Sequence, residues 1–325
     1  MTPWTGGLPP AAHERIERQR ASGTSGSLLS APAAAALRSA GLAPVGEVFG
    51  CLVMNLGWTG GQCGVYGLGY ATTQPNGVFL NAGIAGFTQY RETPVFTSGR
   101  NTNRYSGFGP YVKAFEAAWQ GALNRMLTEA AALGAEGVVG VTIKRARLEG
   151  QIWEFTAAGT AVRSADGSLV SASAHGTRVW SSVLSPEDTA AAILSSLVPR
   201  GIVLGLSVAT KHEDSLLRSQ RLSWGNTEIE GLSAVQQAAR GEARSLMSKR
   251  AESMGGSDLV VDRSEMHEFE TECGGEKDFH AEAFFVGTVL APGPMHAFRG
   301  KDKPGTGRIL NVLPLTDPPT RRSRR

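Results

Sequence analysis

Two stretches of the chain show the apolar spacing of a long amphipathic helix that is followed at once by an apolar strand. In the first, apolar residues recur every three or four positions over 110–133 and form one stripe on a helix. Gly134 is suited to end that helix, and residues 137–143 are almost uncharged, as a buried strand would be. A weaker copy covers 232–254, and a glycine pair follows it. The pattern predicts one helix-to-strand corner in each half of the chain.

A second repeated pattern precedes each long helix. Ser30 and Ser185 can each cap a short helix that has a proline in its first turn, Pro32 or Pro186. Each short helix leads into a strand with the pattern Pro-x-Gly-x-Val-x-Gly, and the two copies are 155 positions apart. The matched residues are Pro44, Gly46, Val48 and Gly50 in the first copy and Pro199, Gly201, Val203 and Gly205 in the second. The duplication predicts two units with the same order of elements.

The repeat divides the chain into two domains of α+β class, which we expect at residues 30–184 and 185–291. Each has the order β-α-β-β behind its short helix, and its last two strands form a hairpin. A Gly-rich insertion at about 57–108 separates the first strand of domain 1 from its long helix, and domain 2 has a longer, acidic hairpin. Insertions fall in loops, so these two places are where unit-specific function is expected.

The remaining segments are predicted from composition and short patterns. Residues 1–29 and 292–325 lack a hydrophobic period and are predicted to be disordered, with a short helix at 11–20. Short strands fit the insertion around 78–80 and 94–97, and one more strand fits 168–182 between the units.

Composition and charge narrow the class of protein. The cysteines Cys51, Cys63 and Cys273 are odd in number and unrelated in spacing, which argues for a reducing compartment. The start of the chain has no signal-peptide pattern, and no run of about 20 apolar residues predicts a membrane span. We therefore expect a cytoplasmic protein. The net charge of +3 arises in the C-terminal tail, which ends in RRSRR and supports at most weak, salt-sensitive contact with nucleic acid.

The repeated residues also carry a resemblance. The Pro-x-Gly-x-Val-x-Gly strand, Leu133-Gly134-Ala135, Gly137-Val138-Val139-Gly140-Val141 and Gly159-Thr160-Ala161-Val162 resemble the YbjQ family, in its tandem two-domain actinobacterial form. The resemblance implies β-α-β-β domains that assemble into pentameric rings, a heavy-metal-binding label without a transferable ligand motif, and no established catalytic activity. It covers about 30–163 well and 185–291 more weakly. Homo-oligomers, pentameric or decameric, are therefore expected.

A metal site is the chemical hypothesis with the clearest local pattern. If Gly274-Gly275 forms a two-residue turn, Phe269 faces His280 and His267 faces Glu282. His267, His280 and Glu282 would then share one face within reach of a divalent cation. Cys273 would lie too far along the strand to be a fourth ligand. The alternative is a solvated hairpin whose acidic residues keep an edge strand soluble.

Other candidate groups have simpler structural interpretations. A turn centred on Glu149-Gly150 would place Arg145 opposite Glu154 as an ion pair. Cys51 is expected to be a small core residue. Cys63 in the Gly-rich insertion has no His or Lys nearby that would activate it.

Three functions remain open from the sequence. The first is a non-enzymatic, ring-forming assembly or binding protein, which could contact a protein partner through the Gly-rich insertion. The second is a metal-binding or metal-responsive protein that uses the hairpin of domain 2. The third is an enzyme with a site at subunit junctions, although no nucleotide-binding fingerprint or G-x-S-x-G element occurs.

Overall fold

The computed structural model describes residues 7–22, 29–56, 93–98, 107–164, 179–273 and 276–293. Both units predicted from the repeat are present, and the α+β class is confirmed. Unit 1 consists of α2 (Ala31–Ser39), β1 (Leu42–Asn55), α5 (Gly109–Ala132), β3 (Gly137–Glu149) and β4 (Ile152–Ser164). Unit 2 consists of α6 (Pro186–Leu194), β6 (Leu197–His212), α8 (Glu230–Ser253), β7 (Asp258–Cys273) and β8 (Glu276–Pro292).

Each unit builds one sheet around its antiparallel closing hairpin. Sheet A has the strand order β1-β4-β3-β5, where β5 is Trp180–Ser181, and sheet B has the order β2-β6-β8-β7, where β2 is Phe96–Thr97. The strand expected between the units is present as β5 (Trp180–Ser181), which pairs in parallel with β3. The strand expected at 94–97 is β2 (Phe96–Thr97), but it pairs with β6 of unit 2. A segment of the unit 1 insertion thus completes the sheet of unit 2.

The capping residues act as the sequence predicted, and the structure gives a reason for two of the repeated glycines. Ser30 accepts a hydrogen bond from the Ala33 amide, and Ser185 accepts one from the Asp188 amide. A Cβ on Gly50 would lie 2.0 Å from the carbonyl oxygen of Ala122, and a Cβ on Gly205 would lie 2.3 Å from that of Ala243. The first strand of each unit therefore touches the backbone of its long helix at the same place, where only glycine fits.

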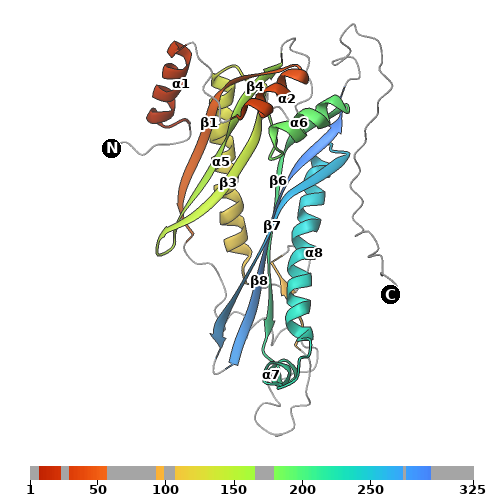
Figure 1. The fold of residues 1–325 in the computed structure, drawn as a ribbon. Helices are drawn as coiled ribbons and strands as arrows, with labels where there is room; N and C mark the ends of the chain where they lie inside the picture. Colours follow the sequence, from red (N-terminus) through yellow and green to blue (C-terminus); the bar gives the residue numbers. More distant parts are fainter. Residues whose placement is uncertain are drawn as a thin grey trace, which may run out of the picture.

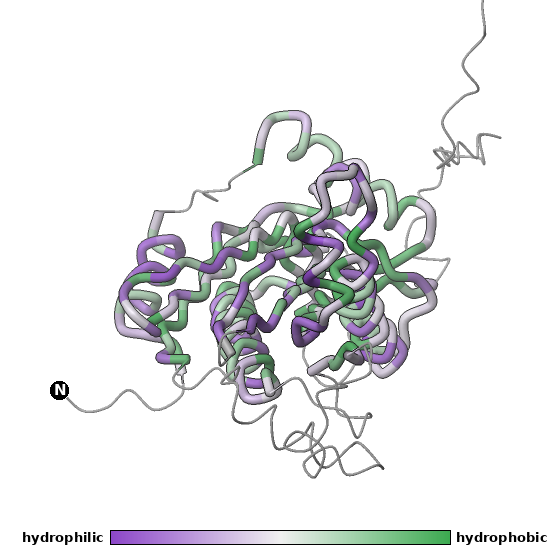
Figure 2. Tube along the Cα trace, turned by 90° about the horizontal axis from the view of Figure 1, so that it is seen from below, coloured by the Kyte–Doolittle hydropathy of each residue, from purple (hydrophilic) through white to green (hydrophobic). Residues whose placement is uncertain are grey.

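The long helix of unit 1 lies between the two sheets (Figure 1). Leu204 and Leu206 of β6 belong to the core that contains Phe115 and Trp119 of α5. The opposite face of sheet B packs under α8, where Val203 lies in a separate core. The layers therefore run sheet A, α5, sheet B, α8. Figure 2 shows hydrophobic and hydrophilic residues intermixed along the chain. In sheet B, which is covered on both faces, β6 and β8 are buried over most of their length.

An additional helix, α1 (Pro10–Ser22), packs against unit 1 at the outer edge of sheet A (Figure 1). This helix includes the short helix that was expected at 11–20. It packs against α5 and is therefore not part of a disordered segment, as 1–29 was predicted to be. Ala12 and Ile16 are buried, and Arg15 makes two hydrogen bonds of 2.6 and 2.7 Å to Glu129 of α5. A short helix, α7 (Ser215–Arg221), lies at the opposite end of the molecule. Among the described helices, none is long and apolar enough to cross a membrane.

Candidate functional site

The hairpin residues predicted from the Gly274-Gly275 turn pair as expected. Phe269 is opposite His280, and His267 is opposite Glu282. Side chains that are directly opposed in an antiparallel pair lie on the same face, so these four share one face of sheet B. The turn itself lies outside the described residues. The shared face is the one that meets unit 1.

His280 is a buried, neutral imidazole. Its side chain is 2% exposed, Nδ1 lies 2.9 Å from the hydroxyl of Thr210, and Nε2 lies 2.8 Å from the hydroxyl of Thr271. The ring stacks on Phe269 at 4.7 Å and receives the edge of Phe108 from unit 1 at 5.0 Å. Burial lowers the pKa of His280 to about 4, so the ring is uncharged at neutral pH.

Glu282 is bound by two residues of unit 1. Its carboxylate lies 2.7 Å from the Arg145 guanidinium of β3, and it accepts a hydrogen bond from the hydroxyl of Tyr111 on α5. The Arg145 guanidinium also lies over the rings of Phe115 and Phe284. Burial and then the Glu282 carboxylate raise the pKa of Tyr111 well above its ordinary value. The carboxylate is thus fully engaged inside the contact between the units.

These contacts bear directly on the metal hypothesis. His267 is exposed and stacks on Phe269 at 6.0 Å, so a phenyl ring occupies the space between the two imidazoles. Within the described ranges, no group of three His, Cys, Asp or Glu side chains is placed to hold a metal ion. His267, His280 and Glu282 share a face, as predicted, but as arranged they do not fit a cation. Metal binding by these residues stays a prediction.

The predicted pairing of Arg145 with Glu154 is wrong. A register shift between Arg147 and Glu149 places Ala146, rather than Arg145, opposite Glu154. Arg145 consequently points to the other face of sheet A, where it meets Glu282 of unit 2. The bulge therefore converts an expected contact within unit 1 into a contact between the units.

Cys51 is not the core residue that we expected. It is half-buried on the outer face of sheet A, and its Sγ lies 3.3 Å from a carboxylate oxygen of Glu154. Burial and the hydrogen bond to Glu154 raise the pKa of Cys51 to about 11, which disfavours the reactive thiolate. Cys63 lies outside the described residues.

Sequence reasoning missed a charged network at the far end of sheet B. His212, the last residue of β6, lies 2.7 Å from Asp278 through Nδ1 and 2.6 Å from Glu276 through Nε2. The hydrogen bond to Asp278 is the main reason that the pKa of His212 is raised, and Glu276 adds to it. Next to it, Glu213 pairs with Arg221 of α7 at 2.7 Å. The run of charged residues at the end of this apolar strand could have indicated the network from the sequence. The network joins α7 to sheet B.

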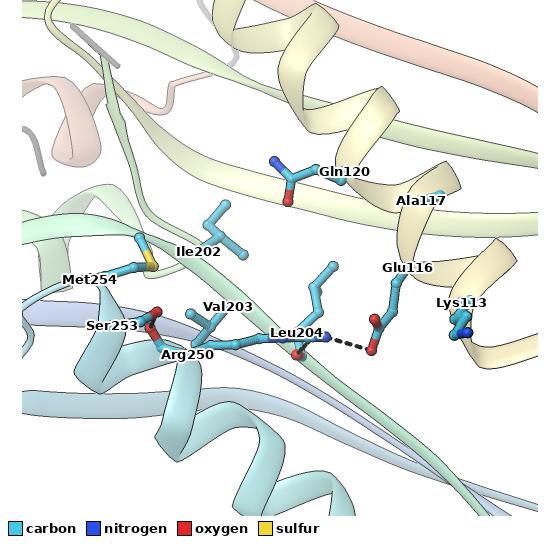
Figure 3. Close-up of a pocket in the computed structure, with 10 residues that line it drawn as sticks. All are labelled: Lys113, Glu116, Ala117, Gln120, Ile202, Val203, Leu204, Arg250, Ser253 and Met254. Carbon is cyan, nitrogen blue, oxygen red and sulfur yellow. Dashed lines mark hydrogen bonds and ion pairs between the residues drawn. The ribbon is translucent and has the colours of Figure 1, made fainter. Parts of the chain in front are cut away.

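A cavity of about 500 Å³ lies between α5, β6 and α8 (Figure 3). None of its lining residues was a candidate from the sequence. An ion pair of 2.6 Å between Glu116 of α5 and Arg250 of α8 spans it. The lining residues are Lys113, Glu116, Ala117, Gln120, Ile202, Val203, Leu204, Arg250, Ser253 and Met254.

Comparison with known proteins supports the resemblance over part of the chain. Residues 103–165, which include α5, β3 and β4, match the model of the YbjQ_1 family, described as "Putative heavy-metal-binding". The match confirms the resemblance for this part of unit 1 and does not extend to unit 2. No curated protein and no solved structure matches the chain.

Proposed function

We propose that this protein is a non-enzymatic assembly protein whose copies associate through the same contact of sheet and helix that joins its two units. The polar groups of the site support a structural role. Glu282 is bound by Arg145 and Tyr111, and both nitrogens of His280 face hydroxyl groups. Such a buried network of paired groups holds two surfaces in one arrangement, and these groups are engaged with one another.

The observation that carries the proposal is an uncovered face on sheet A. Val53 and Ala146 are both opposite Glu154, so the three side chains lie on the same face, the one turned away from α5. Ile152 belongs to that face by strand alternation, and the exposed Leu148 lies at the register shift next to Glu149, which is opposite Ile152. Val53 is 54% exposed, Leu148 56% and Ile152 39%, which makes an apolar patch among the described residues.

The matching face on sheet B is covered. The repeat aligns Val53, Leu148 and Ile152 with Val208, Phe269 and His280. In sheet B these positions meet Phe108 and Tyr111 at the start of α5. Unit 1 therefore seals the face of sheet B, while the described residues leave the same face of sheet A open to a second copy.

The geometry of this contact favours an extended assembly. The two units meet through different surfaces, the back of a helix on one and the face of a sheet on the other. Such a head-to-tail contact, when it is repeated between copies, produces a closed ring or an open filament. The resemblance to ring-forming domains favours closure, and a pentamer or decamer is the expected product.

Light scattering of the full chain at micromolar concentration tests the proposal. We expect an oligomeric mass for the unmodified chain and a monomeric mass for Leu148→Glu, because a charge within the patch must be desolvated on docking. Leu194→Glu is the matched control, since Leu194 is 54% exposed at the end of α6, outside the patch and the long helices, and the change should leave the mass unchanged. A monomer for the unmodified chain would overturn the proposal.

A further inference from the structure

The cavity between α5 and α8 occupies in unit 2 the place that α1 occupies in unit 1. In unit 1, Gln19 donates a hydrogen bond of 3.0 Å to the carbonyl of Glu47, and Arg15 binds Glu129. Arg20 donates to the carbonyl of Ala132 at the end of α5. The repeat aligns the residues that α1 contacts with lining residues of the cavity: Glu47, Phe49, Glu129 and Ala132 correspond to Ile202, Leu204, Arg250 and Ser253.

The charge at the centre of the two sites is reversed. In unit 1, the buried carboxylate of Glu129 accepts a hydrogen bond from the Phe49 amide and binds the guanidinium of Arg15. In unit 2, Arg250 donates to the carbonyl of Leu204, which corresponds to Phe49. The same position of the long helix therefore anchors the same residue of the strand, through an acid in one unit and a base in the other.

The described residues fill the second site only in part. Glu116 of α5 supplies the acid for Arg250, as Arg15 of α1 supplies the base for Glu129. However, α5 reaches this site from the far side, and a cavity of about 500 Å³ remains between it and Met254 (Figure 3). That volume lies within the range of binding sites for small molecules and for a turn of a helix.

We propose that this cavity is the docking site for a helical segment of a partner polypeptide that carries a carboxylate where α1 carries Arg15. The occupant is a helix because a helix fills the corresponding site of unit 1. It carries a carboxylate because Arg250 and Lys113 both line the cavity. The guanidinium has five N–H donors, so Arg250 can bind a second carboxylate without releasing Glu116. Ile202 and Met254 supply the apolar contact beside it.

Charge excludes the most obvious alternative occupant, which is α1 of a second copy. Its Arg15 would meet Arg250, and like charges in a partly buried site repel one another. Arg250 is 35% exposed and Glu116 is 28% exposed, so a new partner can reach the pair from solvent.

The test uses two peptides derived from residues 9–22, one with the natural sequence and one with Arg15→Glu. Each is titrated into the full chain, labelled with 15N, and amide shifts are followed by NMR. We expect the Arg15→Glu peptide to bind at least about tenfold more tightly than the natural peptide. The amides that shift should include those of Ile202, Ser253 and Met254.

Three protein variants separate the cavity from other surfaces. Arg250→Glu should reverse the preference between the two peptides, and Ala117→Trp, which fills the cavity from an exposed position on α5, should abolish binding of both. Arg240→Glu, an equal charge change at an exposed position of α8 outside the lining, should change neither affinity. Equal binding of the peptides, shifts that map elsewhere, or no binding of the Arg15→Glu peptide would each overturn the proposal.

Discussion

In unit 1 the edge of the first strand is covered by α1, whereas in unit 2 the corresponding edge faces a cavity. The two units nevertheless place a glycine against the same turn of the long helix, at Gly50 and at Gly205. The positions that set the distance between strand and helix are therefore the same in both units. The positions that differ, such as Glu129 and Arg250, lie where each unit contacts another element: α1 at Glu129 and α5 at Arg250.

The same contrast holds for the closing strands. Glu154 and Glu282 occupy matching places, but Glu154 accepts a hydrogen bond from Cys51 on the outer face of sheet A, and Glu282 is enclosed by Arg145 and Tyr111. A carboxylate on a solvent-exposed face keeps its hydration, but it loses that hydration when another unit covers the face. It is then tolerated only because that unit brings a guanidinium. Sequence repetition alone thus does not show which copy carries the contact.

The largest effect is expected from breaking this enclosed pair. Arg145→Gln leaves the Glu282 carboxylate, which is 4% exposed, without its cation, and should lower the free energy of unfolding by about 3–5 kcal/mol. Glu154→Gln, the matched change on the open face, should alter it by less than about 0.5 kcal/mol. Urea unfolding measures both. Equal losses in the two variants would contradict the assigned difference between the faces.

A smaller effect is expected where the two units agree. Gly50→Ala and Gly205→Ala each drive a methyl group into a helix carbonyl, at 2.0 and 2.3 Å, and each should cost about 3 kcal/mol. The control is Gly241→Ala on α8, where a Cβ would have no neighbour within 4 Å. It should instead stabilise the chain by about 0.5–1 kcal/mol, because alanine favours a helix over glycine.

The elements within each unit could be predicted from the sequence, because they depend on local patterns. The glycine pair after Cys273 set the register of the unit 2 hairpin, and Ser30 and Ser185 marked helix starts. The partner of Arg145 could not be predicted, since the bulge before Glu149 that turns it to the other face has no sequence signature. The docking of the units rests on contacts between distant segments, which no local pattern encodes.

The ion pairs Arg15–Glu129 of unit 1 and Glu116–Arg250 of unit 2 differ in burial. Breaking each pair should therefore lower the free energy of unfolding by a different amount. Arg15→Ala leaves Glu129, which is 0% exposed, with only the Phe49 amide, and should cost about 2 kcal/mol. Glu116→Ala leaves Arg250 partly exposed and still bonded to Leu204, so it should cost less than about 1 kcal/mol. Guanidinium unfolding distinguishes the two; a greater loss for Glu116→Ala would reverse this ranking.

The buried imidazole of unit 2 should make stability depend on pH. Burial lowers the pKa of His280 from 6.5 to about 4, so the unfolded chain binds the proton more readily than the folded chain. Its contribution to stability is complete above pH 6.5 and is lost as the pH falls toward 4. Between pH 7 and pH 5 the loss should be about 2 kcal/mol.

Comparison with a variant separates the contribution of His280 to this pH dependence from the contributions of other titrating groups. His280→Gln keeps hydrogen-bonding capacity toward Thr210 and Thr271 without a titrating ring, so its unfolding free energy should fall less over the same range. His212, whose pKa is raised, stabilises the fold in the opposite direction, below its folded pKa, and is present in both proteins. Identical pH profiles would show that His280 is not buried as a neutral ring.

The smallest effect is expected from removing the proposed metal ligands. Zinc or nickel titration of the full chain should give the same affinity before and after His267→Ala/His280→Ala, because Phe269 separates the rings and hydroxyl groups hold His280. A cation at this place would have to displace Arg145 from Glu282. Loss of tight binding in the double variant would show that the covering unit moves away and that the face can be reorganised. That result would assign metal binding, the property named in the family description, to His267, His280 and Glu282 of unit 2.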